Sequence, residues 1–168
     1  PRLIDPAPDA AQREILFSAA LRAPDHGQLR PFRFLTVEGK AREQMGELLV
    51  QALQQSDAEA TPQALDKVRQ GPMRAPLVVV VIAKLQDHLK VPKQEQRITA
   101  GCAAHAVLLA AFALGVGAVW RTGELSYSAQ VAKGLGLEAD EEVVAFLYLG
   151  TPQHPPRTAP KLDRKSVV

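Results

Sequence analysis

The sequence contains very little cysteine, few aromatic residues and no cluster of charge of one sign. Cys102 is the single cysteine among 168 residues, so no disulfide can form within the chain, which suits a reducing compartment. The net charge of +2 comes from lysines and arginines scattered among acidic residues. Nucleic-acid binding requires a clustered basic face, so we expect no nucleic-acid partner. These absences together predict a cytoplasmic protein.

A hydrophobic run long enough to span a membrane is also missing. The apolar stretch expected to be helical, residues 99–114, carries no formal charge over sixteen residues, seven of them alanine, and breaks at Gly115 and Gly117, whereas a membrane span needs about 20. We therefore expect no membrane partner, and a stretch that is apolar all round predicts a buried helix. The length and the 46% hydrophobic content fit one domain over residues 1–168. Because Pro1 stands where an initiator methionine is expected, we expect the natural chain to begin upstream.

Several motifs of catalytic chemistry do not occur. The sequence has no Gly-x-Ser-x-Gly elbow and no phosphate-binding loop of the GxxxxGK[ST] type. Gly115 and Gly117 do not form a dinucleotide fingerprint, because Trp120 occupies the position of the third glycine. The four histidines lie far apart in sequence, without acidic or cysteine neighbours at ligand spacing, so we expect no metal site.

Capping signals and periodicity predict an α+β chain. Asp9 and Gln12 resemble a capping box that opens a helix, which should stop at Arg22 because Ala23 precedes a proline. Further helices are expected over residues 41–55, 62–70, 99–114 and 128–135, and strands over 32–37, 77–83, 118–120 and 143–150. Residues 151–168 are expected to form an extended tail. This order predicts a mixed sheet of three to five strands with helices packed against it.

The remaining polar signals are short motifs that occur in one order along the chain. They are Arg22-Ala-Pro-Asp-His26 with Pro31-Phe32, Arg74-Ala-Pro76, Val91-Pro92 with Glu95, Ala100-Gly-Cys102, the segment 117–123, and Phe-Leu-Tyr-Leu-Gly-Thr-Pro at 146–152. As an ordered set these motifs resemble the FMN-dependent nitroreductase family, and its short branch in particular. The resemblance covers nearly the whole chain.

The resemblance implies a fold, a cofactor and a reaction. The fold is α+β and nitroreductase-like, with a mixed, mainly antiparallel sheet flanked by helices, and it works as an intertwined homodimer with FMN at the interface. NADH or NADPH reduces the flavin, which then reduces a small-molecule acceptor such as a nitroaromatic or a quinone. The protein then needs no catalytic side chain of its own, because the cofactor carries the chemistry.

The resemblance also assigns cofactor-binding residues, which fall in two segments. They are Arg22, His26, Trp120, Arg121, Thr122 and Gly123. The residue types agree with this assignment, because an arginine offers a planar donor fork and a histidine offers a ring nitrogen. Arg121 is the expected phosphate partner, and the segment from Trp120 to Gly123 offers apolar surface and backbone donors near the ring.

Simpler readings remain open for each residue. Arg22 could serve solely to complement the negative end of its helix, an effect worth about 0.3–1 kcal/mol. His26 could serve solely to hydrogen-bond the backbone of its own loop, and Trp120 could be a core residue. His105 is expected in the core or an interface, and Cys102 in packing. The family's Arg-x-Ser segment, which grips the FMN phosphate, would precede Pro1, and Arg30 and Phe32 replace the more usual glutamine and tryptophan. Alternative functions are therefore a flavin carrier or sensor without turnover, or another flavin reaction such as reductive dehalogenation or desaturation.

Overall fold

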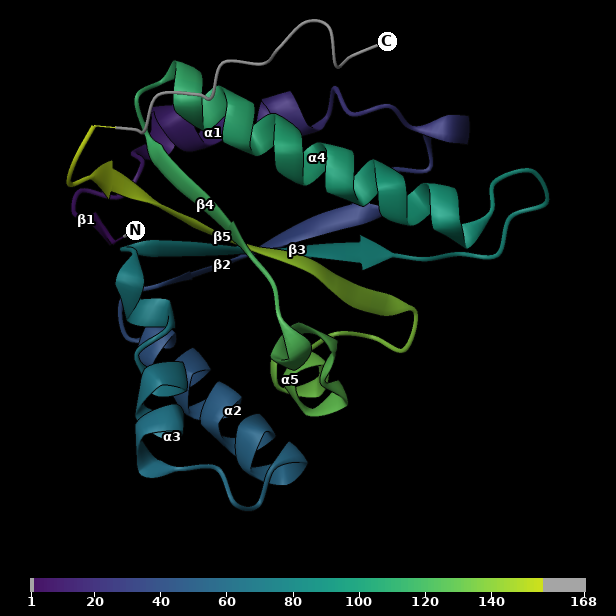
Figure 1. The fold of residues 1–168 in the computed structure, drawn as a ribbon. Helices are drawn as coiled ribbons and strands as arrows, with labels where there is room; N and C mark the ends of the chain where they lie inside the picture. The colour runs from purple at the N-terminus through teal and green to yellow at the C-terminus, as the bar shows by residue number, and fades with distance from the viewer. Residues whose placement is uncertain (1, 156–168) are drawn as a thin grey trace, which may run out of the picture.

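A five-stranded antiparallel sheet forms the centre of the protein in the computed structural model, which describes residues 2–155 (Figure 1). The strands are β1 (Leu3–Ile4), β2 (Phe32–Glu38), β3 (Leu77–Lys84), β4 (Gly117–Arg121) and β5 (Glu141–Pro152). The order is β1-β5-β3-β2, and β4 pairs with β5 over Gly117–Arg121, beside the short pairing of β1. Each predicted strand is confirmed, while the two-residue β1 was not expected.

Helices cover both faces of this sheet. They are α1 (Ala10–Ala20), α2 (Ala41–Ser56), α3 (Pro62–Arg69), α4 (Lys93–Ala113) and α5 (Ala129–Gly134), with short 3-10 turns η1 (His26–Gln28), η2 (Pro72–Arg74) and η3 (Glu124–Tyr127). Figure 1 shows α1 and α4 on one face, and α2, α3 and α5 on the other. The central strand β3 is fully buried from Leu77 to Ala83. Its side chains alternate between two hydrophobic clusters, one under each helical layer.

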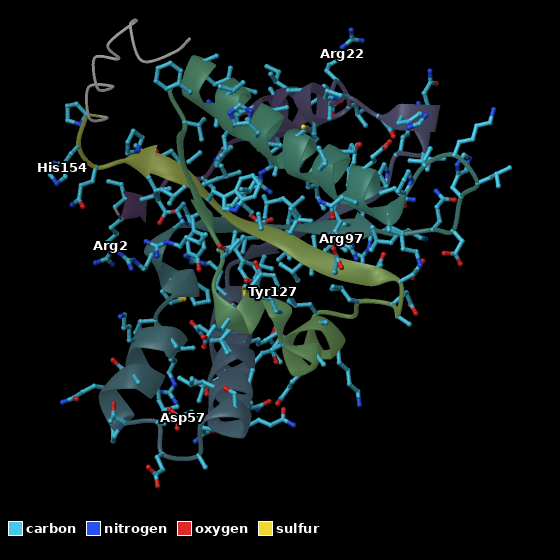
Figure 2. The ribbon with its side chains drawn as sticks, turned by 45° about the vertical axis from the view of Figure 1, so that its right-hand side comes forward. Arg2, Arg22, Asp57, Arg97, Tyr127 and His154 are labelled. Atoms are coloured by element: carbon cyan, nitrogen blue, oxygen red, sulfur yellow. The ribbon has the colours of Figure 1, made fainter. Side chains whose placement is uncertain are left out.

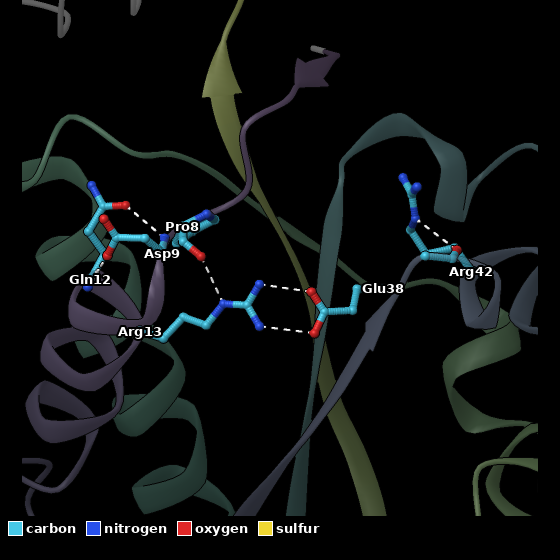
Figure 3. Close-up of polar contacts among 7 residues, drawn as sticks. Pro8, Asp9, Gln12, Arg13, Glu38 and Arg42 are labelled. Carbon is cyan, nitrogen blue, oxygen red and sulfur yellow. Dashed lines mark hydrogen bonds and ion pairs between the residues drawn. The ribbon is translucent and has the colours of Figure 1, made fainter.

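The start of α1 is fixed by the predicted capping box. The Asp9 carboxylate accepts a hydrogen bond from the Gln12 backbone N–H, and the Gln12 side chain accepts one from the Asp9 N–H (Figure 3). One turn later, Arg13 donates two hydrogen bonds to the Glu38 carboxylate on β2, which lowers the pKa of Glu38. These bonds tie α1 to β2. The helix ends at Ala20, so Arg22 lies beyond it and not at its last turn.

Helix α4 differs from the prediction in length and in burial. It begins at Lys93, six residues earlier than expected, and runs for 21 residues. Small residues such as Ala103 and Ala104 lie against α1 and the sheet, but Ile98, Leu109 and Phe112 are exposed by 56%, 58% and 74%. The expectation of a helix buried all round is therefore wrong for the single chain. The absence of charged residues in a helix does not by itself show that the helix is buried on all sides.

The length of α4 also changes the membrane argument. By length and composition alone, α4 could cross a membrane, and it is the one such helix in the described part of the chain. This is weak evidence, because a core helix passes the same test, and the inner face of α4 is packed on α1 and the sheet. At the other end, β5 continues through Pro152, so the predicted tail starts as a strand. The rest of the tail, from residue 156, lies outside the described residues.

Candidate functional site

The loop between α1 and β2 carries the first two candidate residues, and its backbone is tightly constrained. Gly27, Gln28 and Arg30 have φ of 75°, 53° and 47°, in the left-handed region that residues other than glycine seldom adopt. The Asp25 carboxylate accepts hydrogen bonds from the backbone N–H groups of Leu29 and Arg30, at 3.2 and 2.7 Å. These bonds hold a conformation that is costly for the backbone, and such strain tends to occur at functional sites.

His26 makes a contact that the sequence did not predict. Its Nδ1 lies 2.6 Å from Oε2 of Glu95, in the first turn of α4, with the two side chains 56% and 47% exposed. Within residues 2–155, Nε2 forms no hydrogen bond, so it is the ring nitrogen left for a ligand. The sequence signal for this contact was Glu95 itself, which belongs to the ordered motifs but lies 69 positions from His26.

Arg22 is exposed beside this loop. Figure 2 shows its side chain pointing away from the layer formed by α1 and α4. The Arg22 side chain forms no ion pair or hydrogen bond in the described part of the chain, and only its backbone N–H donates, to the Ala19 carbonyl. A guanidinium with open donors fits a ligand that carries phosphate or carbonyl oxygens.

The other candidate residues lie on or after β4, and successive side chains point to opposite faces of the sheet. Trp120 pairs with Leu147, whose side chain belongs to the cluster under α1 and α4, and it is 37% exposed. Arg121 pairs with Phe146, in the opposite cluster, and its Cζ lies 5.5 Å from the ring centre of Tyr148. Burial raises the pKa of Tyr148, and the nearby Arg121 charge opposes this shift. Arg121, the expected phosphate partner, is therefore stacked on an aromatic ring in the single chain.

Thr122 and Gly123 form the exposed turn after β4. Gly123 has φ of 137°, a conformation that a side chain would strain, although a Cβ there would meet no atom within 4 Å. The Gly123 carbonyl accepts hydrogen bonds from the Ser126 backbone N–H and from the Ser126 hydroxyl. Ser126 thus holds the turn through the Gly123 carbonyl, while the exposed side of the turn is accessible to a ligand.

The structure does not bring the six residues together within one chain. The loop with Arg22 and His26 leads into β2, whereas Trp120 and Arg121 belong to β4, at the opposite edge of the sheet. Three strand spacings separate these edges, or about 14 Å. A cavity of about 100 Å³ and another of about 430 Å³ contain none of the six in their walls. The candidate site therefore consists of two separate exposed halves.

The larger cavity lies next to the turn at Gly123. Its wall includes Tyr127 from η3, Arg97 from α4 and Glu142 from β5, and Figure 2 shows Tyr127 and Arg97 near β5. Arg97 and Glu142 form an ion pair, and Glu141 pairs with Arg33 at 2.6 Å. The Arg33 hydrogen bond lowers the pKa of Glu141 to about 2, against burial, which opposes this shift. No motif in the sequence predicts this cavity.

The chemistry of the exposed groups fits a flavin nucleotide. Arg22 and the Nε2 atom of His26 offer polar contacts, Trp120 offers an aromatic surface, and the backbone at Gly123 allows close approach. Among residues 2–155, no group of three or more His, Cys, Asp or Glu side chains could hold a metal ion.

Comparison with known proteins adds the relatives of this chain. The sequence profile of the nitroreductase family matches residues 4–151. An Escherichia coli K12 protein named "Putative NAD(P)H nitroreductase YdjA" is 42% identical over 152 residues, which are 90% of this chain and 82% of that protein. A nitroreductase-like family protein from Bacillus cereus has a TM-score of 0.82 at 19% identity, covering 99% and 87% of the two chains. An FMN-dependent nitroreductase from Clostridium difficile has a TM-score of 0.68 at 22% identity, covering 99% and 91%. Because both solved structures are less than 25% identical to this chain, they show that the fold is shared.

Proposed function

This chain belongs to the nitroreductase family, and we propose that it is an FMN-dependent oxidoreductase that takes hydride from NADH or NADPH and reduces a small acceptor such as a nitroaromatic or a quinone. The observation that carries the proposal is the placement of the two halves of the candidate site. Both halves are exposed, and both offer groups suited to a flavin. The names of similar proteins support the same cofactors.

The residues of this chain have distinct tasks in such a reaction. Bound FMN supplies hydride acceptance and hydride donation. Arg22 and His26 would bind and orient polar edges of the cofactor, and Trp120 would offer an aromatic surface to its ring. The turn at Thr122 and Gly123 offers backbone groups, and Arg121 binds phosphate if it leaves the Tyr148 ring. The cavity beside Tyr127 has room for a small acceptor, since ligand pockets measure about 300–1,000 Å³.

We further propose that the working form is a homodimer with FMN between the two chains. The support is the outer stripe of α4, defined here as Ile98, Cys102, His105, Leu109 and Phe112, which recurs at helical spacing. None of these residues carries a permanent charge, and a contiguous apolar face of this kind marks an interaction surface. A second copy on this stripe would also add the missing half of each site, because the two halves lie at opposite edges of one chain's sheet.

The test is an anaerobic visible spectrum of the purified protein, before and after the addition of NADPH and then NADH. We expect a bound-flavin spectrum that bleaches within seconds. A flavin spectrum that persists with both reductants contradicts the oxidoreductase and favours the carrier or sensor. A colourless protein that does not bind added FMN contradicts flavin binding altogether. Replacement of His26 by alanine should lower flavin content, whereas the same change at the exposed His154 should not.

A further inference from the structure

We propose that Glu95 is a positioning residue for the cofactor: its carboxylate accepts a hydrogen bond from the Nδ1–H of His26 and so presents Nε2 of the imidazole to FMN. This inference rests on the proposed function, because it assigns a role toward the same ligand. It adds a residue on a different element, α4, to the two exposed segments already described. It also assigns the tautomer of the imidazole, which the sequence leaves open.

The first argument is geometric. The Nδ1–Oε2 distance of 2.6 Å is short for a hydrogen bond between a ring N–H and a carboxylate, as expected when charge assists it. A carboxylate at Nδ1 requires a proton there, so Nε2 carries either a lone pair or, in the imidazolium, a second proton. In both cases the ring plane is fixed and Nε2 points away from Glu95. Partners of this kind orient histidines in binding sites and fix their tautomer.

The second argument is the rigidity of the loop that carries His26. Three of the four residues from Gly27 to Arg30 have positive φ, and Asp25 holds two backbone N–H groups of this stretch. An added Cβ on Gly27 would lie 3.3 Å from Val91, just before α4, so the loop packs closely against the start of that helix. Asp25 therefore fixes the backbone and Glu95 fixes the side chain. The two acids leave His26 with little freedom before a ligand arrives, which lowers the entropy lost on binding.

A structural role for Glu95 makes a different prediction. An acidic residue in the first turn of a helix stabilises the helix end, and an exposed ion pair adds little to stability. Either effect would change the melting temperature slightly and leave the affinity for FMN unchanged. Glu43 occupies the corresponding place in the first turn of α2 and is exposed, so Glu43→Ala is a matched control.

The experiment measures FMN dissociation constants by fluorescence titration for wild type, Glu95→Ala, Glu95→Gln, His26→Ala and the double alanine variant. We expect Glu95→Ala to weaken binding about tenfold, with partial rescue in Glu95→Gln, whose amide oxygen still accepts from Nδ1. In the His26→Ala background, loss of Glu95 should have little further effect, because Glu95 acts through the ring. Equal losses in both backgrounds, or wild-type affinity in Glu95→Ala, overturn the proposal.

A second readout does not need the cofactor. Nitrogen NMR of the apo protein, at a pH where the imidazole is neutral, should find His26 protonated at Nδ1 in wild type and mainly at Nε2 in Glu95→Ala. An Nε2-protonated His26 in wild type overturns the proposal. If wild type does not bind FMN at all, the proposed function fails, and the tautomer still decides whether Glu95 sets the state of His26.

Discussion

At the scale of single residues, the exposed charge of Arg22 can influence the redox potential of a bound flavin. Its guanidinium has no acidic partner among residues 2–155, so its charge is available to a neighbouring cofactor. Positive charge near a flavin favours the anionic reduced form over the neutral oxidised form. We therefore expect Arg22→Gln to lower the flavin midpoint potential by roughly 30 mV, which for a two-electron couple is about 1.4 kcal/mol.

The measurement is a redox titration with a reference dye, with Lys133→Gln on the exposed surface of α5 as a control of equal charge change. The control should leave the potential unchanged. Equal potentials in wild type and Arg22→Gln would remove this electrostatic role and leave Arg22 as a binding group only.

A second residue-scale prediction concerns the ion pair between Arg33 and Glu141. The Glu141 side chain is 2% exposed, and its pKa falls from 4.5 to about 2 through the Arg33 hydrogen bond. A carboxylate with a lowered pKa stabilises the folded state above its ordinary pKa, and this contribution disappears as pH falls from 4.5 to about 2. Arg33 is 38% exposed and partly screened, so we expect Glu141→Gln to cost about 2 kcal/mol at pH 7.

Urea unfolding as a function of pH tests this. The difference between wild type and Glu141→Gln should shrink steadily below pH 4.5. The neighbouring Glu142→Gln, which breaks a pair with both partners about two-fifths exposed, should cost under about 1 kcal/mol. A pH-independent difference for Glu141→Gln would contradict the role of its charge.

At the scale of elements, helix α4 packs one face against the core and exposes the other face. Its inner face carries small residues against α1 and the sheet, while the outer stripe carries larger apolar groups. If a second copy covers the stripe, Leu109→Asp combined with Phe112→Asp places four carboxylates in the symmetric interface. We expect this to cost about 2–4 kcal/mol of association free energy, or roughly a 30- to 1,000-fold weaker dimer.

Size-exclusion chromatography with light scattering, over a range of protein concentrations, provides the check. The variant should elute as a folded monomer with reduced flavin content. Gln54→Asp, on the exposed side of α2, introduces the same group away from the stripe and should leave the dimer intact. A wild-type protein that is monomeric with full flavin occupancy would contradict the interface.

Local signals predicted much of the secondary structure correctly. The capping box at Asp9 and the strand expected over residues 77–83 each depend on residues within a few positions of one another. The early start of α4 was missed, because its first turn is polar and has no side-chain cap. The contact between His26 and Glu95 joins residues that only the folded loop brings together, and no periodicity encodes such a contact.

At the scale of the whole molecule, the sheet order determines how a site can form. With β2 and β4 at opposite edges, Arg22 and His26 of one chain lie far from Thr122 and Gly123 of the same chain. In the proposed homodimer, a ligand that touches both halves lies between two copies. The sequence therefore predicts the two groups of candidate residues separately, whereas the distance between them depends on the strand order.

The arrangement predicts complementation between two defective chains. Arg22→Asp and Thr122→Asp each place a negative charge in one exposed half, and each should exclude an anionic cofactor. When the two variants are mixed and allowed to exchange subunits, about half of the dimers are mixed, and each contains one intact site and one doubly altered site. Flavin occupancy and NAD(P)H oxidation should then recover to about a quarter of the wild-type level.

The reciprocal mixture separates this arrangement from a site within one chain. A chain carrying both substitutions, mixed equally with wild type, forms hybrids in which every shared site has one altered half. Activity should then fall to about a quarter of that of an equal total amount of wild type, because only the wild-type dimers remain competent. If each site belonged to a single chain, the hybrid would keep one working site, activity would stay near half, and the first mixture would not recover. The two mixtures therefore give opposite answers for the two arrangements, using substitutions at exposed positions that leave the core unchanged.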